Sequence, residues 1–309
     1  MVQSVLFTLT QVIIPISVPV AAGALLVRFM RLEIKPLLTV VLYILSPAMV
    51  FTNLTAVQIT FAELAGVAAF FVINASLMWT VSFTAGKAFR LPDSERAGLA
   101  LMSVLTNAVN YGLPLVQLAY GQAGMEKASV FVVFMLIFTN TFGVYFAARS
   151  NFSVRQAIMA VFKLPAIYAV VLAVTLRFAG LSLPSGIFKG VSMISQAYSP
   201  VMLMVLGAQM ARVKTVALDS GSDVAFWSGL TVRMIVSPLV AFAVLSVLGI
   251  KGLLFPTLLI LASMPVAVNA GLLAENFNAA PDVVSKCVLW TTLSSFIVLP
   301  VLISLISMI

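Results

Sequence analysis

The sequence predicts an all-α membrane protein with ten transmembrane helices in two inverted five-helix repeats, of which helices 4 and 9 are broken and cross. Composition, long apolar segments and recurring landmarks support this prediction. Of the 309 residues, 62% are hydrophobic and 8% are charged, whereas a soluble domain carries about 25% charged residues. A fold of this length cannot bury so much apolar surface away from water, so we infer that its solvent is lipid.

The individual spans follow from the distribution of charge. A spanning helix needs ~20 predominantly apolar residues, and eight uncharged segments are long enough: 1–27, 36–62, 64–86, 97–125, 128–148, 190–211, 252–274 and 287–309. Two weaker candidates complete the ten, namely 164–176 and 224–249, the second of which contains Arg233. Glu63 precedes the third span and is expected to cap it.

The basic residues predict an orientation. Twelve lysines and arginines lie in the loops after odd-numbered spans, four lie in the other loops, and Arg233 is the remaining one. By the positive-inside rule the odd loops are cytoplasmic. We therefore expect a multi-pass protein of the plasma (inner) membrane with both termini extracytoplasmic. The formal charge of +8 is spread over these loops, which indicates topology and no nucleic-acid partner.

Landmarks in the first half recur in the second half. Three proline pairs lie 150, 153 and 151 residues apart: Pro15 and Pro165, Pro47 and Pro200, and Pro114 and Pro265. We interpret residues 1–150 as a first repeat and 151–309 as a second. Because five is odd, the second repeat starts on the opposite side of the membrane, as in secondary transporters with alternating access.

Two spans contain matching interruptions. The segment "TNAVNYGLPLVQLAYG" has Gly112 and Pro114 inside an uncharged span, and "ASMPVAVNAGLLAENF" has Pro265. A proline inside a helix removes a hydrogen bond and clashes with the preceding turn. Since lipid cannot satisfy unwound backbone, both breaks must face protein or a watery cavity. Paired interruptions of this kind indicate a transporter's binding site.

The residues at the breaks favour a negatively charged substrate. Each second half-helix would begin near the membrane midplane with free N–H groups and a positive dipole end. Asn107, Asn110 and Asn269 can donate to a carboxylate. No lysine or arginine lies near either break in the sequence, so we expect binding without a fixed basic residue. The alternative is a pair of kinked helices whose asparagines serve packing alone.

These motifs, "NAVNYGLPLVQLAYG" followed by "MPVAVNAGLLAENFNAAP", resemble the auxin efflux carrier family over essentially the full chain. The resemblance implies that spans 4 and 9 cross at Pro114 and Pro265, and that Asn107 contacts substrate. It implies a scaffold of spans 1, 2, 6 and 7, a mobile transport domain of spans 3–5 and 8–10, and a homodimer.

The chain departs from plant members of that family. It lacks their long cytoplasmic loop, which indicates a prokaryotic type. Span 3 carries Asn74 where plant members can use an acid, which argues against an auxin-like charge arrangement. The resemblance to bacterial members implies small carboxylates such as malate or malonate, with auxin-like acids as the wider class.

Three further residues are candidates for ion coupling or for the substrate path. Arg233 lies inside span 8. It either has a functional role, or snorkels so that its charged group reaches the membrane interface, or pairs its helix with a neighbouring one. Glu275 is the only acid contiguous with a broken helix, so it either couples a proton or is a solvated residue at the helix exit. Gln117 either lines the path or pairs helices.

The function that we predict is a secondary transporter or facilitator of small organic anions with elevator-type alternating access. The chain has no histidine and no nucleotide-binding motif, so we expect no enzymatic activity, cofactor, metal or direct use of ATP. Proton and sodium coupling both stay open. The alternatives are a sodium-coupled symporter of the bile-acid type, a non-saturating channel, and an intramembrane enzyme or receptor.

Overall fold

The computed structural model describes residues 2–30, 32–143, 159, 162–213 and 220–306, and they form helices joined by short turns. Within these residues the only β-type pairing is one isolated antiparallel bridge between Thr106 and Val266. The all-α prediction is therefore confirmed.

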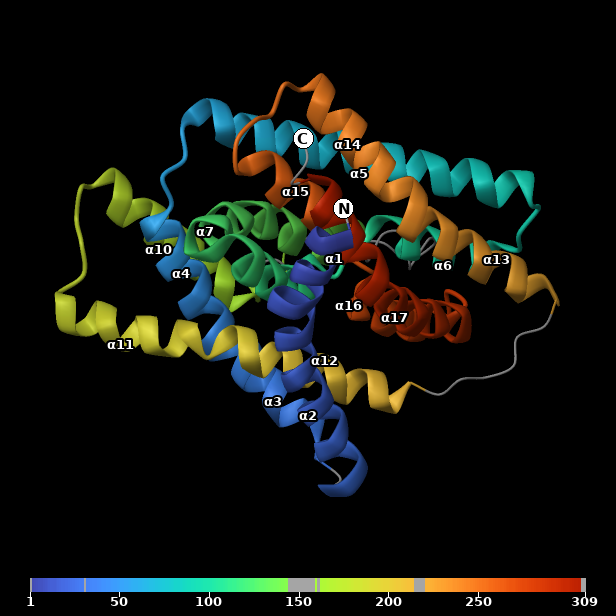
Figure 1. Cartoon of the computed structure of the whole chain (residues 1–309), viewed down its shortest axis with the longest axis horizontal. Helices are drawn as coiled ribbons and strands as arrows, with labels where there is room; N and C mark the ends of the chain where they lie inside the picture. Colours follow the sequence, from blue (N-terminus) through green and yellow to red (C-terminus); the bar gives the residue numbers. More distant parts are fainter. Residues whose placement is uncertain (1, 31, 144–158, 160–161, 214–219, 307–309) are drawn as a thin grey trace.

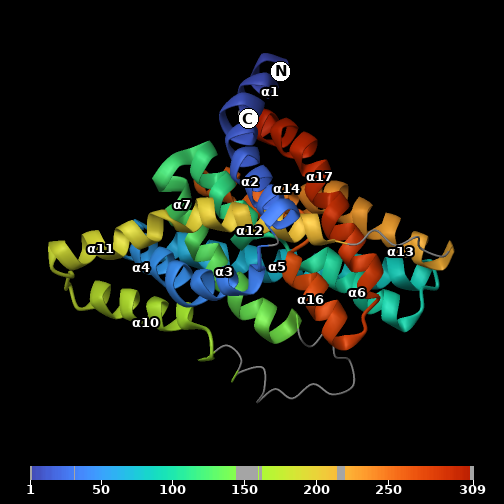
Figure 2. The same cartoon turned by 90° about the horizontal axis from the view of Figure 1, so that it is seen from below.

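Figures 1 and 2 show the helices from two directions, with long helices crossing one another at steep angles. In the first half of the chain the α-helices, and the short π-helical turns marked η, are α1 (Val2–Thr8), η1 (Leu9–Ile13), α2 (Ile14–Met30), α3 (Ile34–Val40), η2 (Val41–Leu45), α4 (Ser46–Ala56), α5 (Phe61–Ala88), α6 (Asp93–Val104), η3 (Ala108–Gly112), α7 (Leu113–Phe138) and η4 (Thr139–Gly143). The second half contains α10 (Pro165–Phe178), α11 (Ser185–Gln196), α12 (Tyr198–Arg212), α13 (Ser220–Thr231), η5 (Val232–Val236), α14 (Ser237–Val247), α15 (Leu254–Ala262), α16 (Val268–Phe277) and α17 (Pro281–Ile306).

Seven helical segments of the described chain are long and apolar enough to cross a membrane, and α10 is a shorter apolar helix. One of the seven, Ala108–Thr141, bends at Gly121, where φ is 65° and ψ is −160°. It therefore covers parts of two predicted spans. Another predicted span is divided between α15 and α16, which are 9 and 10 residues long. The protein is a multi-pass membrane protein, and the number of ten crossings stays a prediction.

Four of the five π-turns described end two residues before a proline, at Pro15, Pro47, Pro114 and Pro238. A proline ring clashes with the carbonyl four residues earlier in a regular α-helix. A π-turn contains one extra residue, and we infer that this moves the carbonyl away from the ring. These prolines therefore widen their helices locally without breaking them.

Helices α2 and α12 cross with their backbones in direct contact. A Cβ atom added to Gly23 would lie 1.9 Å from the carbonyl oxygen of Met204, and one added to Gly207 would lie 1.8 Å from that of Val20. The two glycines thus make reciprocal contacts, each against the partner helix. In the same part of the molecule α4 packs along α10.

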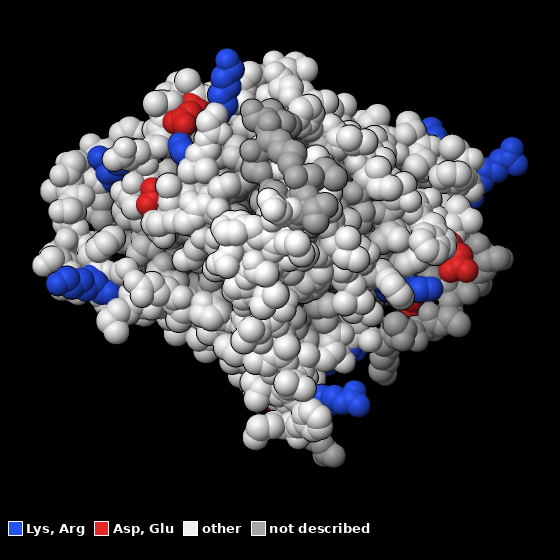
Figure 3. All heavy atoms as spheres, in the orientation of Figure 1, with Lys and Arg blue, Asp and Glu red and all other residues white. Residues whose placement is uncertain are grey.

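The start of α5 is capped as the sequence predicts. Thr60 and Glu63 form a reciprocal capping box, in which each side chain bonds the other's backbone N–H, and this satisfies two otherwise unpaired donors. Glu63 also forms an ion pair of 2.9 Å with Lys127 of α7. On the face shown in Figure 3 the charged side chains lie toward the edges and leave a broad uncharged surface.

We predict that Gly23→Ala lowers the thermal stability of the purified protein in detergent. The new methyl group must push α2 and α12 apart, and overpacking of this kind costs about 1–3 kcal/mol. Gly186→Ala in α11 is the matched control, because its Cβ would meet nothing within 4 Å. The control should be neutral or slightly stabilising, and equal melting temperatures for the two variants would contradict the close crossing.

Candidate functional site: the crossing of two interrupted helices

The two interrupted helices meet through their backbones. After α6 the chain is extended at Leu105, with φ −87° and ψ 108°. The amide of Asn107 donates to the carbonyl of Pro265 at 2.9 Å, and the amide of Ala267 donates to the carbonyl of Leu105 at 2.9 Å. These two bonds form the bridge between Thr106 and Val266, and they pair backbone groups that lipid could not satisfy.

Each second half-helix begins directly beyond this bridge. η3, which continues as α7, starts at Ala108, and α16 starts at Val268. Neither N-terminus has a capping hydrogen bond from its N-cap side chain. The first N–H groups of a helix have no partner within it, and the end carries a partial positive charge. The crossing therefore brings two positive helix ends close to one point.

Polar side chains at the crossing are buried and only partly satisfied. Among the described residues the Nδ2 atom of Asn107 and the Oγ1 atom of Thr106 have no hydrogen-bond partner, although these two residues are only 2% and 5% exposed. Ser103 Oγ, in the last turn of α6, is also buried without a partner. Unsatisfied buried polar atoms are rare and need an explanation such as a ligand or water.

The predicted crossing point at Pro114 is wrong, while Pro265 does lie in the bridge. Pro114 is near the start of α7, seven residues after Asn107, and the π-turn η3 accommodates it. Gly112, which the sequence predicts to lie in the interruption, does not interrupt the helix. Its backbone is helical, and an added Cβ would lie 2.8 Å from Leu261 Cδ2, so Gly112 permits close packing of η3 on α15.

Although no lysine or arginine lies near either break in the sequence, the fold brings one close to the crossing in space. Arg233, in η5, is 0% exposed, which excludes snorkelling. Its Nη1 atom donates to the carbonyl of Ser103 at 2.9 Å, and its Nη2 atom donates to the carbonyl of Ala262 and to Ser237 Oγ. Arg233 is more than 100 residues from Ser103 in sequence, so only the tertiary fold brings it to the crossing.

Tyr198 connects the crossing to α12, and sequence reasoning missed it. Its side chain is 1% exposed, and the hydroxyl donates to the carbonyl of Val109 in η3 at 3.1 Å. The neighbouring Ser199 hydroxyl donates to the side-chain oxygen of Gln117 at 2.6 Å. The Ser-Pro motif at Pro200 marks this region in the sequence, but no local pattern identifies its partner.

The remaining candidates lie farther along the second half-helices. Asn110 is partly buried within η3, and Asn269 is exposed at the second residue of α16. Glu275 is exposed near the end of α16. No group of three or more His, Cys, Asp or Glu residues among the described ones could hold a metal ion.

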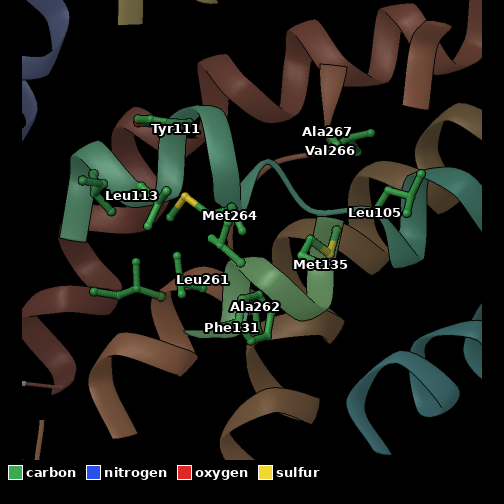
Figure 4. Close-up of a cluster of buried hydrophobic side chains, with 14 of the residues drawn as sticks. Leu105, Tyr111, Leu113, Phe131, Met135, Leu261, Ala262, Met264, Val266 and Ala267 are labelled. Atoms are coloured by element: carbon green, nitrogen blue, oxygen red, sulfur yellow. The ribbon is translucent and has the colours of Figure 1, made fainter. Parts of the chain in front are cut away.

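Apolar side chains surround the crossing. Figure 4 shows buried hydrophobic side chains, among them Tyr111, Leu261, Met264 and Met135, gathered around the chain segments that carry Leu105 and Val266. All of these are buried. An apolar surround lowers the local dielectric constant and strengthens interactions with any charge that reaches the helix ends.

A multi-pass helical protein in which two interrupted helices meet inside the membrane has the architecture of a membrane transporter. Residues 28–303 match the family described as "Membrane transport protein", the auxin efflux carrier family, and the chain belongs to that family. Its members are transporters and not enzymes.

Two archaeal relatives resemble the chain along most of its length. An uncharacterized transporter of Methanocaldococcus jannaschii is 28% identical over 276 residues, which cover 86% of this chain and 87% of the relative. An uncharacterized transporter of Methanothermobacter thermautotrophicus is 25% identical over 263 residues, which cover 84% and 85%. Both relatives are named as transporters, and neither name states a substrate.

We predict that Tyr198→Phe destabilises the protein, because the carbonyl of Val109 loses a buried donor at a cost of about 0.5–1.5 kcal/mol. Thermal unfolding in detergent measures the change. Tyr168→Phe removes the same kind of bond, since the Tyr168 hydroxyl donates to the carbonyl of Phe162 at 2.8 Å on the exposed surface. Tyr168→Phe should lower the melting temperature less than Tyr198→Phe does. A larger decrease for Tyr168→Phe would argue against the contact between Tyr198 and η3.

Proposed function

We propose that this transporter moves small organic anions, namely carboxylates such as malate or malonate or auxin-like acids, across the plasma membrane by elevator-type alternating access. The observation that carries the proposal is the pair of uncapped helix N-termini that begin at the bridge, beside the unpartnered amide of Asn107. The transport itself follows from the family, and the substrate and the mechanism are our inference.

Electrostatics favours an anion at this point. A helix N-terminus stabilises a negative charge by about 0.3–1 kcal/mol at exposed sites and up to ~2 kcal/mol when partly buried. Two such ends reinforce each other, and the amide of Asn107 offers a directed donor. Asn110 and Asn269, in the first turns of the two half-helices, complete the substrate contacts that we assign. We assign Gly112, Pro114 and Pro265 to the backbone that positions these substrate contacts.

The packing supports an inverted repeat of residues 1–150 and 151–309. If span 1 corresponds to span 6, and span 2 to span 7, then the α2–α12 contact is equivalent to the α4–α10 contact. A rotation that exchanged the two halves of the chain would place α2 on α10 and α12 on α4, and the α2–α12 contact would then coincide with the α4–α10 contact. The antiparallel bridge between the two interrupted helices is consistent with the same pseudo-twofold relation.

The elevator mechanism assigns α1–α4 and α10–α12 to the scaffold and the remaining helices to the moving part. Side-chain hydrogen bonds join the two groups: Asn53 of α4 donates to Ser129 Oγ of α7 at 2.9 Å and accepts from Gln122 Nε2 at 3.1 Å. The Ser199–Gln117 bond joins α12 to α7. Bonds of this kind can be exchanged for others when one group slides past the other.

Other parts of the proposal rest on the sequence and the family resemblance. We infer extracytoplasmic termini from the distribution of basic loops and a homodimer through the scaffold from the resemblance. Gln117 is assigned to the substrate path. Proton coupling would use Glu275, the exposed acid of α16, and sodium coupling remains the alternative.

We predict that Asn107→Ala weakens L-malate binding at least about tenfold, since a hydrogen bond to a charged group contributes about 1.5–3 kcal/mol. Uptake of radiolabelled L-malate into proteoliposomes gives KM and Vmax. Asn140→Ala is the matched control, because the Asn140 side chain bonds only the carbonyl of Leu136 one turn earlier in the described structure. Unchanged KM in Asn107→Ala with normal uptake would remove Asn107 from the site.

The same vesicles separate the alternatives. Saturable uptake supports a carrier, whereas flux that rises linearly with L-malate concentration supports a channel. Stimulation by a sodium gradient favours the symporter, and stimulation by a proton gradient that Glu275→Gln abolishes favours proton coupling. If no carboxylate moves while the protein remains folded, the organic-anion assignment fails.

A further inference from the structure

Arg233 is a buried cation with neutral partners. Its hydrogen-bond acceptors among the described residues are two backbone carbonyls and one serine hydroxyl. A charge inside the membrane is costly and persists only where other groups compensate for it. Among the described residues, the dipoles of these neutral groups compensate the charge through Nη1 and Nη2, while the Nε atom has no hydrogen-bond partner.

Both carbonyl groups that accept from Arg233 lie at the C-terminal end of a helix. Ser103 is the penultimate residue of α6, and Ala262 is the last residue of α15. The final carbonyls of a helix have no partner within it, and the end carries a partial negative charge. One guanidinium group thus caps the C-terminal ends of both α6 and α15, the half-helices that precede the crossing.

This contact lies directly before the crossing in both segments. Leu105 follows the α6 end by one residue and accepts from Ala267, while Pro265 follows the α15 end by three residues and accepts from Asn107. Holding the two ends at a fixed separation also fixes the bridge between them. The second half-helices begin one residue beyond the bridge amides, at Ala108 and Val268.

We propose that Arg233 is a positioning residue, whose guanidinium clamps the C-terminal ends of α6 and α15 and thereby holds the two anion-binding N-termini in register. This inference rests on the proposed anion site for its effect on binding, but the clamp itself is independent of the substrate. The planar guanidinium fork reaches acceptors on two helices at once, which a single ammonium group does less well.

The Ser237 hydroxyl supports the clamp on the α15 side. Ser237 lies one helical turn after Arg233, accepts from Nη2, and donates to the carbonyl of Ala262 at 2.9 Å. The Ala262 carbonyl therefore receives two donors, one from each residue. This arrangement favours a fixed orientation of the guanidinium group over a mobile one.

Hydrogen–deuterium exchange of the purified full-length protein tests the clamp. Arg233→Gln should accelerate exchange at the amides of Asn107 and Ala267 by about tenfold or more, because hydrogen bonds to a charged group are lost. Amides in the α2–α12 crossing should keep their wild-type rates. Arg212→Gln is the matched control, since Arg212 also donates to a backbone carbonyl, that of Leu32 at 2.7 Å, but on the exposed surface.

A conservative variant covers the case in which Arg233→Gln does not fold. Arg233→Lys keeps the charge and loses the fork, so the bridge amides should still exchange faster than in the wild type. Wild-type exchange at Asn107 and Ala267 in a folded Arg233→Gln or Arg233→Lys variant overturns the proposal.

Binding of L-malate adds a readout that a purely structural role would not change selectively. In proteoliposomes, Arg233→Lys should raise KM for L-malate more than it lowers Vmax, because the helix ends lose their register. Equal KM in Arg233→Lys and the wild type would show that the clamp does not act on the site. If wild-type protein does not transport L-malate, the proposed substrate fails, and the exchange experiment still decides the clamp.

Discussion

The arrangement depends on one constraint, which is that every backbone polar group inside the membrane needs a partner. An interruption in a single helix leaves N–H and carbonyl groups unpaired, and lipid offers none in return. The antiparallel bridge solves this for two interruptions together, since Leu105 and Pro265 accept bonds from Ala267 and Asn107. Each interruption therefore stabilises the other, and beyond the bridge each second half-helix begins with N–H groups that have no partner within it.

Two sets of prolines in this protein act differently, and the difference decides where the crossing lies. Pro15, Pro47, Pro114 and Pro238 each follow a π-turn by two residues and remain inside continuous helices. Pro265 instead lies in extended chain between α15 and α16. The segment opposite it, Leu105–Asn107, contains no proline at all, so pairing with another segment, more than the proline ring, maintains the interruption there.

The sequence therefore predicts some features and not others. Hydrophobicity predicts the apolar helices, Glu63 predicts the cap of α5, and Pro265 predicts one interruption, because these are local patterns. Pro114 was the wrong landmark, since a local rule cannot distinguish a widened helix from a broken one. The Arg233 contacts with Ser103 and Ala262 and the Tyr198 contact with Val109 are non-local. They depend on how helices cross, which a single sequence does not specify.

The two kinds of helix contact differ in how easily they can move. Between α2 and α12, Gly23 and Gly207 bring backbone against backbone, so sliding by even a fraction of a turn would force side chains into the space that the glycines leave. Between α4 and α7 the contact includes amides and hydroxyls of Asn53, Gln122 and Ser129, which can exchange partners at small net cost. We therefore expect sliding between α4 and α7 and not between α2 and α12. This physical difference does not depend on the identity of the substrate, and it is consistent with the proposed division into a rigid scaffold and a part that moves against it.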